Sequence, residues 1–229
     1  MINFFYSVRN LIILSVAIPL AVLLFFSFNS CKKKVDKLTI SGLLYQNGIS
    51  SPLSGVHVTL KAKKMSGGAW TSNYETVTSG TTGADGKFSF TFNLMKVSGY
   101  RLIFEKTNYF TLTNDFSDNV LSNGGEYFKN YQVYAVAYLE VHIKNSTPVN
   151  SSDFMTYQLT GGTSGDIDCC SDTISNFFGT NIDVTRICKT YADQNIKIDW
   201  RYTKINIPHI SVINITCPAF DTTSVQLFY

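Results

Sequence analysis

The chain has 229 residues, of which 45% are hydrophobic and 15% charged, and its formal net charge is +3. This composition is too hydrophobic for a disordered chain, and the small net charge predicts no strong electrostatic partner. The length suffices for one large or two small domains with buried cores. Composition and charge therefore exclude a disordered protein and give no indication of nucleic-acid binding.

The N-terminus carries an uncharged apolar run at residues 11–28, followed by Asn29, Ser30 and Cys31 and then by three lysines. A small residue before a cysteine, directly after such a run, resembles the cleavage site of bacterial lipoprotein signal peptides of the Bacteroidetes type. The resemblance implies that residues 1–30 are removed, that Cys31 is acylated with palmitate-like chains, and that residues 31–37 form a tether. Each buried CH₂ of an acyl chain contributes about 0.8 kcal/mol to membrane binding. We therefore expect a lipid anchor in the outer membrane of the cell envelope.

Two other interpretations of the run stay open. Eighteen apolar residues are near the lower limit for a single N-terminal transmembrane anchor. The lysines that follow the run would keep the rest of an uncut chain in the cytoplasm by the positive-inside rule. An ordinary secreted protein with a cleaved signal peptide is the third interpretation.

The other cysteines all lie in the last third of the chain, at Cys169, Cys170, Cys188 and Cys217. An even number of cysteines in an exported chain predicts two disulfides. A bridge between two adjacent cysteines is strained, so we expect each of the first two to pair with one of the last two; free buried thiols are the alternative. Zinc sites use paired spacings such as C-x₂-C, which are absent here, so we expect no metal and no cofactor.

Apolar and polar residues alternate along most of the chain after the tether, and Gly, Asn, Ser and Asp interrupt the alternation. The clearest stretches are 38–40, 56–60, 88–92, 100–104, 139–143, 196–202, 210–215 and 224–229. Many short strands separated by turns are typical of β-sandwiches. We therefore predict an all-β protein with two consecutive β-sandwich domains, at residues 38–135 and 136–229, with residues 131–144 running from one into the other.

Residues 38 to about 110 resemble the carboxypeptidase regulatory-like domain, a transthyretin-like sandwich. The matching motifs are Pro52-Leu-Ser-Gly-Val-His-Val-Thr-Leu60, Thr82-Gly-Ala-Asp-Gly-Lys-Phe-Ser-Phe90 and Tyr100-Arg-Leu102. Gly83 departs from the family pattern, which often has Asp there. The resemblance implies a spacer or docking module and little about activity. The second half matches no family by its motifs, and we expect an Ig-like or a transthyretin-like sandwich there.

Few residues suggest catalysis. The three histidines are His57, His142 and His209; alternation directs the first two away from the core, and the third follows a proline. The chain has no H-E-x-x-H, G-x-S-x-G or phosphate-binding glycine loop. We therefore expect no catalytic residues and a protein that is not an enzyme.

Residues 66–74 are predicted to form a flexible polar loop that carries two aromatic residues, Trp70 and Tyr74. Exposed rings of this kind anchor sugars and proteins, although Trp70 could instead cap an edge of the sandwich. The sequence as a whole favours a non-catalytic structural or binding module of the cell envelope, with an envelope protein or a glycan as partner. A fimbria-like adhesin or pilus accessory subunit and a small envelope hydrolase are the alternatives.

Overall fold

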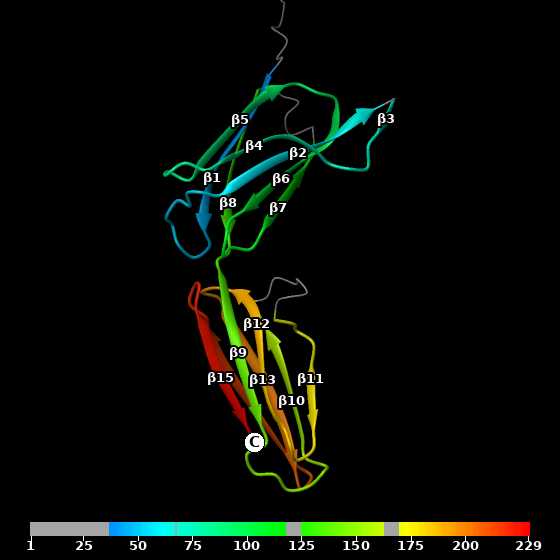
Figure 1. The fold of residues 1–229 in the computed structure, drawn as a ribbon, viewed down its shortest axis with the longest axis vertical. Helices are drawn as coiled ribbons and strands as arrows, with labels where there is room; N and C mark the ends of the chain where they lie inside the picture. The colour runs from blue at the N-terminus through cyan, green and yellow to red at the C-terminus, as the bar shows by residue number, and fades with distance from the viewer. Residues whose placement is uncertain (1–36, 67, 118–124, 163–169) are drawn as a thin grey trace, which may run out of the picture. The chain divides into compact units, whose positions relative to one another are not determined.

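The computed structural model describes residues 37–66, 68–117, 125–162 and 170–229, and all regular elements in these ranges are β-strands (Figure 1). The first eight strands are β1 (Lys37–Gln46), β2 (His57–Ser66), β3 (Ala69–Trp70), β4 (Glu75–Thr81), β5 (Lys87–Asn93), β6 (Val97–Glu105), β7 (Leu112–Phe116) and β8 (Glu126–Val133). The other seven are β9 (Val136–Lys144), β10 (Phe154–Thr160), β11 (Ser175–Phe178), β12 (Asp183–Tyr191), β13 (Asn195–Lys204), β14 (Ile207–Thr216) and β15 (Thr222–Phe228). The predicted all-β fold class, with two β-sandwiches, is confirmed.

The first sandwich consists of strands β1 to β8. In one sheet, β1 pairs antiparallel with β5 and parallel with β8. In the other sheet, β2 pairs with β6 and with both β3 and β4, and β7 follows β6. Its core contains Leu38, Ile40, Leu44, Val56, Val58, Leu60, Ala62, Phe88, Phe90, Val97, Tyr100, Leu102, Phe104, Tyr131 and Val133.

Strand β1 extends well beyond the short strand expected at residues 38–40. Its residues alternate between buried and half-buried over ten positions, as expected for a strand with one face on the core. Gly42 lies where a Cβ atom would be 2.3 Å from the carbonyl oxygen of Lys129 on β8. The glycine therefore allows the close parallel approach of β8, a contact that local sequence does not reveal.

Residues of the two motifs at 52–60 and 82–90 organise one corner of the first sandwich. The Thr82 hydroxyl accepts a hydrogen bond from the Val56 amide (3.0 Å) and donates one to the Leu53 carbonyl (2.9 Å). Gly86 has φ +71°, and a Cβ atom there would lie 2.8 Å from the Leu44 carbonyl oxygen. The turn before β5 therefore requires glycine both for its backbone conformation and for its close packing.

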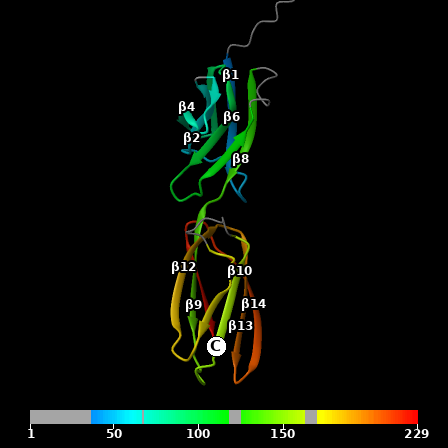
Figure 2. The same cartoon turned by 90° about the vertical axis from the view of Figure 1, so that its right-hand side faces the viewer.

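The second sandwich consists of strands β9 to β15, and Figure 2 shows its strands from a second direction. One sheet has the antiparallel order β11-β10-β13-β14. The other places β9 between antiparallel β12 and parallel β15. Its core contains Ala135, Ala137, Leu139, Val141, Ile143, Met155, Tyr157, Leu159, Cys170, Phe177, Ala192, Ile196, Ile198, Cys217, Val225, Leu227 and Tyr229.

Alternation predicted the orientation of β9 correctly: Leu139, Val141 and Ile143 are buried, whereas Glu140 and His142 are half-buried on the other face. The expected strands at 210–215 and 224–229 correspond to β14 and β15. Strands β10, β11 and β12 were not anticipated. In β10 the buried residues Met155, Tyr157 and Leu159 alternate with polar ones, a pattern that could have predicted the strand. In β12 most residues are exposed, so the sequence has no apolar alternation that would indicate a strand.

Candidate functional site

Tyr74, one of the two predicted binding residues, lies in a cluster of charges on the first sandwich. The guanidinium of Arg101 lies 4.1 Å from the centre of the Tyr74 ring, and the Lys63 ammonium lies 4.8 Å from it. Arg101 also donates two hydrogen bonds of 2.6 Å to the carboxylate of Asp115. These hydrogen bonds lower the pKa of Asp115, whereas burial and then the Asp115 charge raise the pKa of Tyr74.

The Tyr74 cluster is therefore largely satisfied within the chain. Cations are the natural partners of an aromatic face, and two cations of the protein already lie over this ring. Glu75, the next residue, pairs with Lys64 at 3.1 Å. A ligand that stacks on Tyr74 would have to displace Arg101 from the ring, so the structure gives this residue a structural role beside the predicted binding role.

Trp70, the other predicted binding residue, has a described backbone but a side chain outside the described residues. Its backbone differs from the expected loop. Residues Ala69–Trp70 form β3, and Trp70 pairs with Met65 of β2 across a tight hairpin. The expectation of a free loop at residues 66–74 is therefore wrong at this point, because β2 continues far enough to pair with the returning chain.

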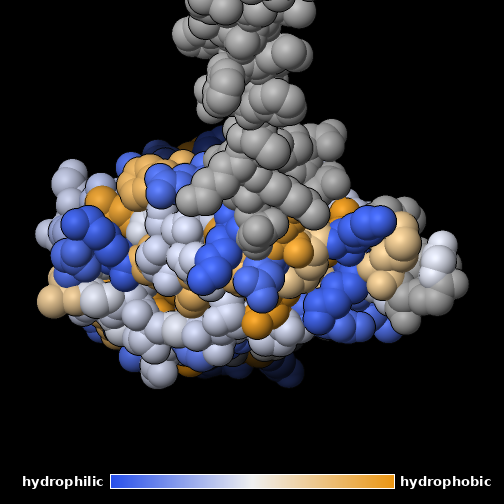
Figure 3. Space-filling model, turned by 90° about the horizontal axis from the view of Figure 1, so that it is seen from above, coloured by the Kyte–Doolittle hydropathy of each residue, from blue (hydrophilic) through white to orange (hydrophobic). Residues whose placement is uncertain are grey.

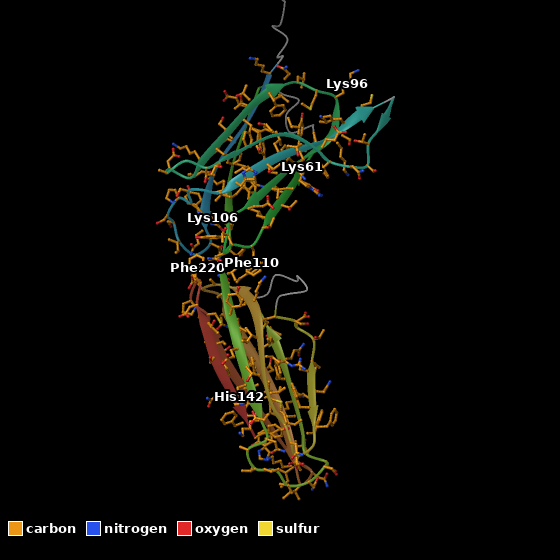
Figure 4. The ribbon with its side chains drawn as sticks, viewed as in Figure 1. Lys61, Lys96, Lys106, Phe110, His142 and Phe220 are labelled. Carbon is orange, nitrogen blue, oxygen red and sulfur yellow. A yellow bond between two sulfur atoms is a disulfide. The ribbon has the colours of Figure 1, made fainter. Side chains whose placement is uncertain are left out.

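The three histidines lie on three strands, His57 on β2, His142 on β9 and His209 on β14. His142 is labelled in Figure 4, on the sheet that contains β9 and β15. His209 stacks on Tyr202, with ring centres 4.5 Å apart. The structure does not bring the histidines together as one site.

His142 has the one polar arrangement that resembles a catalytic pair. Its Nε2 lies 2.7 Å from the Asp183 carboxylate, and the Lys144 ammonium lies 2.8 Å from the other carboxylate oxygen. Hydrogen bonds from His142 and then Lys144 lower the pKa of Asp183. Phe228 packs edge-on against the imidazole. Among the described residues, no hydroxyl or thiol hydrogen-bonds to His142, so the pair lacks a nucleophile of the kind that it could activate.

The cysteines form one disulfide in the described residues, between Cys170 and Cys188, which are separated by 18 in the sequence and have Cα atoms 4.9 Å apart. Cys217 is a free, fully buried thiol, and burial raises its pKa. The expectation that Cys217 forms a second bridge is wrong: its thiol is free and packs within the core of the second sandwich, just after β14. Cys169 lies outside the described residues.

A buried polar cluster, Asn145, Asp153 and Lys204, was not anticipated. The Asn145 amide donates to the Asp153 carboxylate (2.9 Å) and to the Gly179 carbonyl (3.1 Å). Asp153 also accepts from the Val149 amide (2.9 Å). The Lys204 ammonium donates to the Asn145 side-chain oxygen (2.8 Å), and Asn145 and Asp153 are almost fully buried.

This cluster ties the connection between β9 and β10 to the end of β13. The Asn145 hydrogen bond is the main cause of the lowered pKa of Asp153, so the carboxylate is held in its charged form. Lys204 also donates to the hydroxyl and the carbonyl of Thr147 and lies 5.2 Å from the ring centre of Tyr229. All of these partners of Lys204 are groups of the protein, so the main role of Lys204 is to position the chain. The sequence did not predict the cluster because its three side chains are 8 to 59 residues apart.

A shallow groove of about 330 Å³ lies on the outer face of the sheet that contains β10 and β13. Its charged lining residues are Lys197, Asp199 and Arg201, and Lys197 pairs with Asp199 at 2.9 Å. On the side of the molecule seen in Figure 3, hydrophilic and apolar areas are likewise interspersed. Neither surface has the enclosed, mainly apolar character that is usual for small-molecule sites.

Cys31 and the apolar run lie outside the described residues. In residues 37–66, 68–117, 125–162 and 170–229, no helix is long and apolar enough to cross a membrane. The same ranges contain no group of three or more His, Cys, Asp or Glu residues arranged to hold a metal ion.

No protein-family model matches the chain, and no curated protein matches it. Solved structures do match at low identity. They include the TIE protein of Bacillus anthracis (11% identity, TM-score 0.36) and the shaft pilin SpaA of Lactobacillus rhamnosus GG (11%, TM-score 0.31). The 3-chlorocatechol 1,2-dioxygenase of Rhodococcus opacus 1CP is a third (12%, TM-score 0.33).

The coverage of these matches differs. Each of the first two matches covers 85% of this chain, but the chain spans 34% of the TIE protein and 98% of the shaft pilin. The dioxygenase match covers 45% of this chain and 61% of the enzyme. At these TM-scores the likenesses carry no argument about function.

Proposed function

We propose that the chain is a lipoprotein of the cell envelope, anchored in the outer membrane through acylated Cys31, with two β-sandwiches that act as a non-catalytic structural or binding module. The ligand class follows from the exposed surfaces, which are mixed in polarity and shallow and therefore suit an envelope protein or a glycan better than a small molecule.

The observation that carries the non-catalytic role is the pairing of the reactive groups inside the chain. His142 shares Asp183 with Lys144, Arg101 is bound by Asp115, and Lys204 is held by the carbonyl and side-chain oxygens around it. Groups held in this way stabilise strands and loops. They are not aimed into a common cleft, as the hydrolase hypothesis requires.

The disulfide supports the exported location. Disulfides persist in oxidising compartments and are rare in the cytosol, where thiols stay reduced. The Cys170–Cys188 bridge lies in the second sandwich, so that sandwich belongs outside the cytoplasm under this proposal. The uncut anchor with a cytoplasmic body is correspondingly disfavoured.

A fimbria-like subunit is the second candidate function. Subunits of such assemblies need a strand edge that accepts another chain. Strand β14 offers an edge of ten residues that pairs with β13 alone in the described part of the chain. This observation favours the alternative, and strand exchange in purified envelopes would distinguish it from a monomeric spacer.

The test is the intact mass of the protein extracted from membranes with detergent, measured with and without reductant. A mature chain that begins at Cys31 and carries added acyl mass is the expected result. Cys31→Ser is the matched control, and it should lose the acyl mass and leave the membrane fraction. An uncleaved chain without acyl mass would overturn the lipid anchor.

The same preparation tests the binding role. Incubation of the extracted protein with immobilised envelope glycans should retain the wild type, and Arg101→Ala and Tyr74→Ala would report whether their cluster contributes. A turnover of ester, amide or glycoside substrates that is lost in His142→Ala would instead establish the hydrolase.

A further inference from the structure

Strand β14 (Ile207–Thr216) is an edge strand whose outer side has no partner among the described residues. It begins after a two-residue turn in which Ile205 and Asn206 have φ values of 49° and 60°, and Lys204 pairs with Ile207 across the turn. In such a hairpin, the main-chain N–H and C=O groups of every second residue hydrogen-bond to the neighbouring strand. Main-chain groups of the remaining residues therefore point outward; these are Pro208, Ile210, Val212, Asn214 and Thr216.

The side chains of β14 make this edge unusual. The strand IPHISVINIT contains no Lys, Arg, Asp or Glu. Ile207, Ile210 and Val212 are 57%, 70% and 47% exposed. Natural edge strands resist pairing with other chains through charges, proline, short length or bulges, and β14 has one such residue, Pro208, near its start. Strand β12, an edge of the other sheet, is protected by charge, with Asp183, Arg186 and Lys189 among its nine residues.

The other edges of this sandwich are less open to pairing than β14. Strand β11 has four residues, and strand β15 has seven, with polar side chains at most of its exposed positions. Strand β14 thus combines the greatest length, the absence of charge and three exposed apolar residues. Such a strand is a template for the addition of another strand.

The sequence of β14 indicates which strand fits. When β14 is written antiparallel to itself with Ser211 at the centre, one apolar pair forms on each side of the ribbon. These pairs are Ile210 with Val212 and Ile207 with Ile215, whereas His209 faces Ile213 and Pro208 faces Asn214. The outward main-chain groups of Ile210 then meet those of Val212 in the copy. No like charges meet, because the strand has none.

We infer that β14 is a homodimer interface, in which a second copy of this chain adds its own β14 antiparallel about Ser211 and joins the two four-stranded sheets into one. This inference goes beyond the proposed function, because a lipid-anchored module does not require a second copy. The pairing brings Ile207, Ile210 and Val212 against apolar side chains of the copy and satisfies the outward amides and carbonyls of Ile210 and Val212. The Asn214 amide can donate to the Pro208 carbonyl of the copy, but Pro208 has no N–H for the Asn214 carbonyl.

The register gives a sharp test by cross-linking. Ser211 faces its own copy at a pair that lacks direct hydrogen bonds, where Cα atoms lie about 4.5 Å apart, within the range that a disulfide spans. Asn214, three residues away on the same strand, would lie about 20 Å from its own copy. We would express the full chain, extract it in mild detergent and oxidise it with copper phenanthroline.

The expected result is a disulfide-linked dimer for Ser211→Cys and only the background of the unsubstituted chain for Asn214→Cys. In the Ser211→Cys background, Ile210→Lys should reduce the dimer at least tenfold, because two lysines would face the apolar strand of the copy. Ile187→Lys is the matched control on β12, where the native residue is 61% exposed, and should leave the dimer unchanged.

Equal cross-linking of Ser211→Cys and Asn214→Cys would overturn the register and the inference. A dimer that persists undiminished with Ile210→Lys would also overturn it, because the contact would then not depend on β14. Circular dichroism of each variant shows that the strands are retained, so a loss of cross-linking cannot be assigned to unfolding. Capture of a different protein by Ser211→Cys in place of the copy would replace the homodimer by a heterologous partner and refute the inference.

Discussion

The two sandwiches are stabilised in different ways. In the described residues the first sandwich depends on its core of aliphatic and aromatic residues, including Phe88, Phe104 and Tyr131, whose rings contact one another. The second has a core of similar size but adds the Cys170–Cys188 bridge and the buried polar cluster.

The difference follows from how few residues of β12, in the second sandwich, are buried in the core. In β12 the first five residues are exposed, and Thr190 is the one fully buried residue in the strand. A strand with so little apolar contact gains little from the hydrophobic effect. The bridge from Cys188 to Cys170 holds β12 to the rest of the sandwich. Cross-links and buried polar contacts thus supplement packing where a strand contributes few core residues.

The largest expected effect tests whether each core supports its own sandwich. Leu102 on β6 and Leu139 on β9 are both fully buried. Replacement of either by Ala should lower the free energy of unfolding of its own sandwich by about 3–4 kcal/mol, through lost transfer energy and the cavity that remains. Hydrogen exchange resolved by residue measures this. Equal loss of protection in both sandwiches after either change would show that they unfold as one unit.

Loss of the disulfide is the next effect. The double change Cys170→Ser and Cys188→Ser should destabilise the second sandwich by about 3 kcal/mol, since the bridge closes a loop of this length. Denaturant titration with and without reductant measures it. Amides of β1 and β6 in the first sandwich serve as the internal control and should keep their protection. A first sandwich that loses stability in parallel would contradict the local role of the bridge.

The polar cluster is expected to contribute somewhat less. Asn145→Ala removes partners from both Asp153 and Lys204 and should cost about 2 kcal/mol, because the buried groups lose their hydrogen bonds. Asn214→Ala, at an exposed position of β14, is the matched control and should change stability little. Thermal unfolding compares the two, and equal midpoints would show that the cluster does not stabilise the fold.

The smallest expected effect is a dependence of folding stability on acidic pH. The pKa of Asp153 in the folded protein is lowered, chiefly by the Asn145 hydrogen bond, so its contribution to stability is complete above the ordinary carboxyl pKa and is lost as the pH falls through the lowered value. Asp153→Asn should therefore flatten the fall in stability below about pH 4. Asp115→Asn, in the first sandwich, should flatten it less, because the Arg101 pair is more exposed to solvent. Unfolding midpoints from pH 2 to 6 measure both, and identical profiles for the wild type and Asp153→Asn would contradict the assignment.

Residue periodicity alone predicts the strands that have one apolar face. The predicted inward set of β9 is buried, and Gly86 has a positive φ in the turn before β5. Period-two alternation works here because the core is on one side of each strand. It fails for β12, where few residues reach the core, and for β3, where a hairpin forms from residues without an alternating pattern.

The all-β class and the orientation of the strongly alternating strands could be predicted from the sequence alone, because both depend on the local alternation of apolar and polar residues. Only the tertiary structure decided which cysteines meet, that Asn145, Asp153 and Lys204 form one cluster, and that Tyr74 lies under Arg101. These contacts join residues of different connections and strands. The pairing and register of the strands that bring them together depend on the burial of whole strands, which no local pattern records.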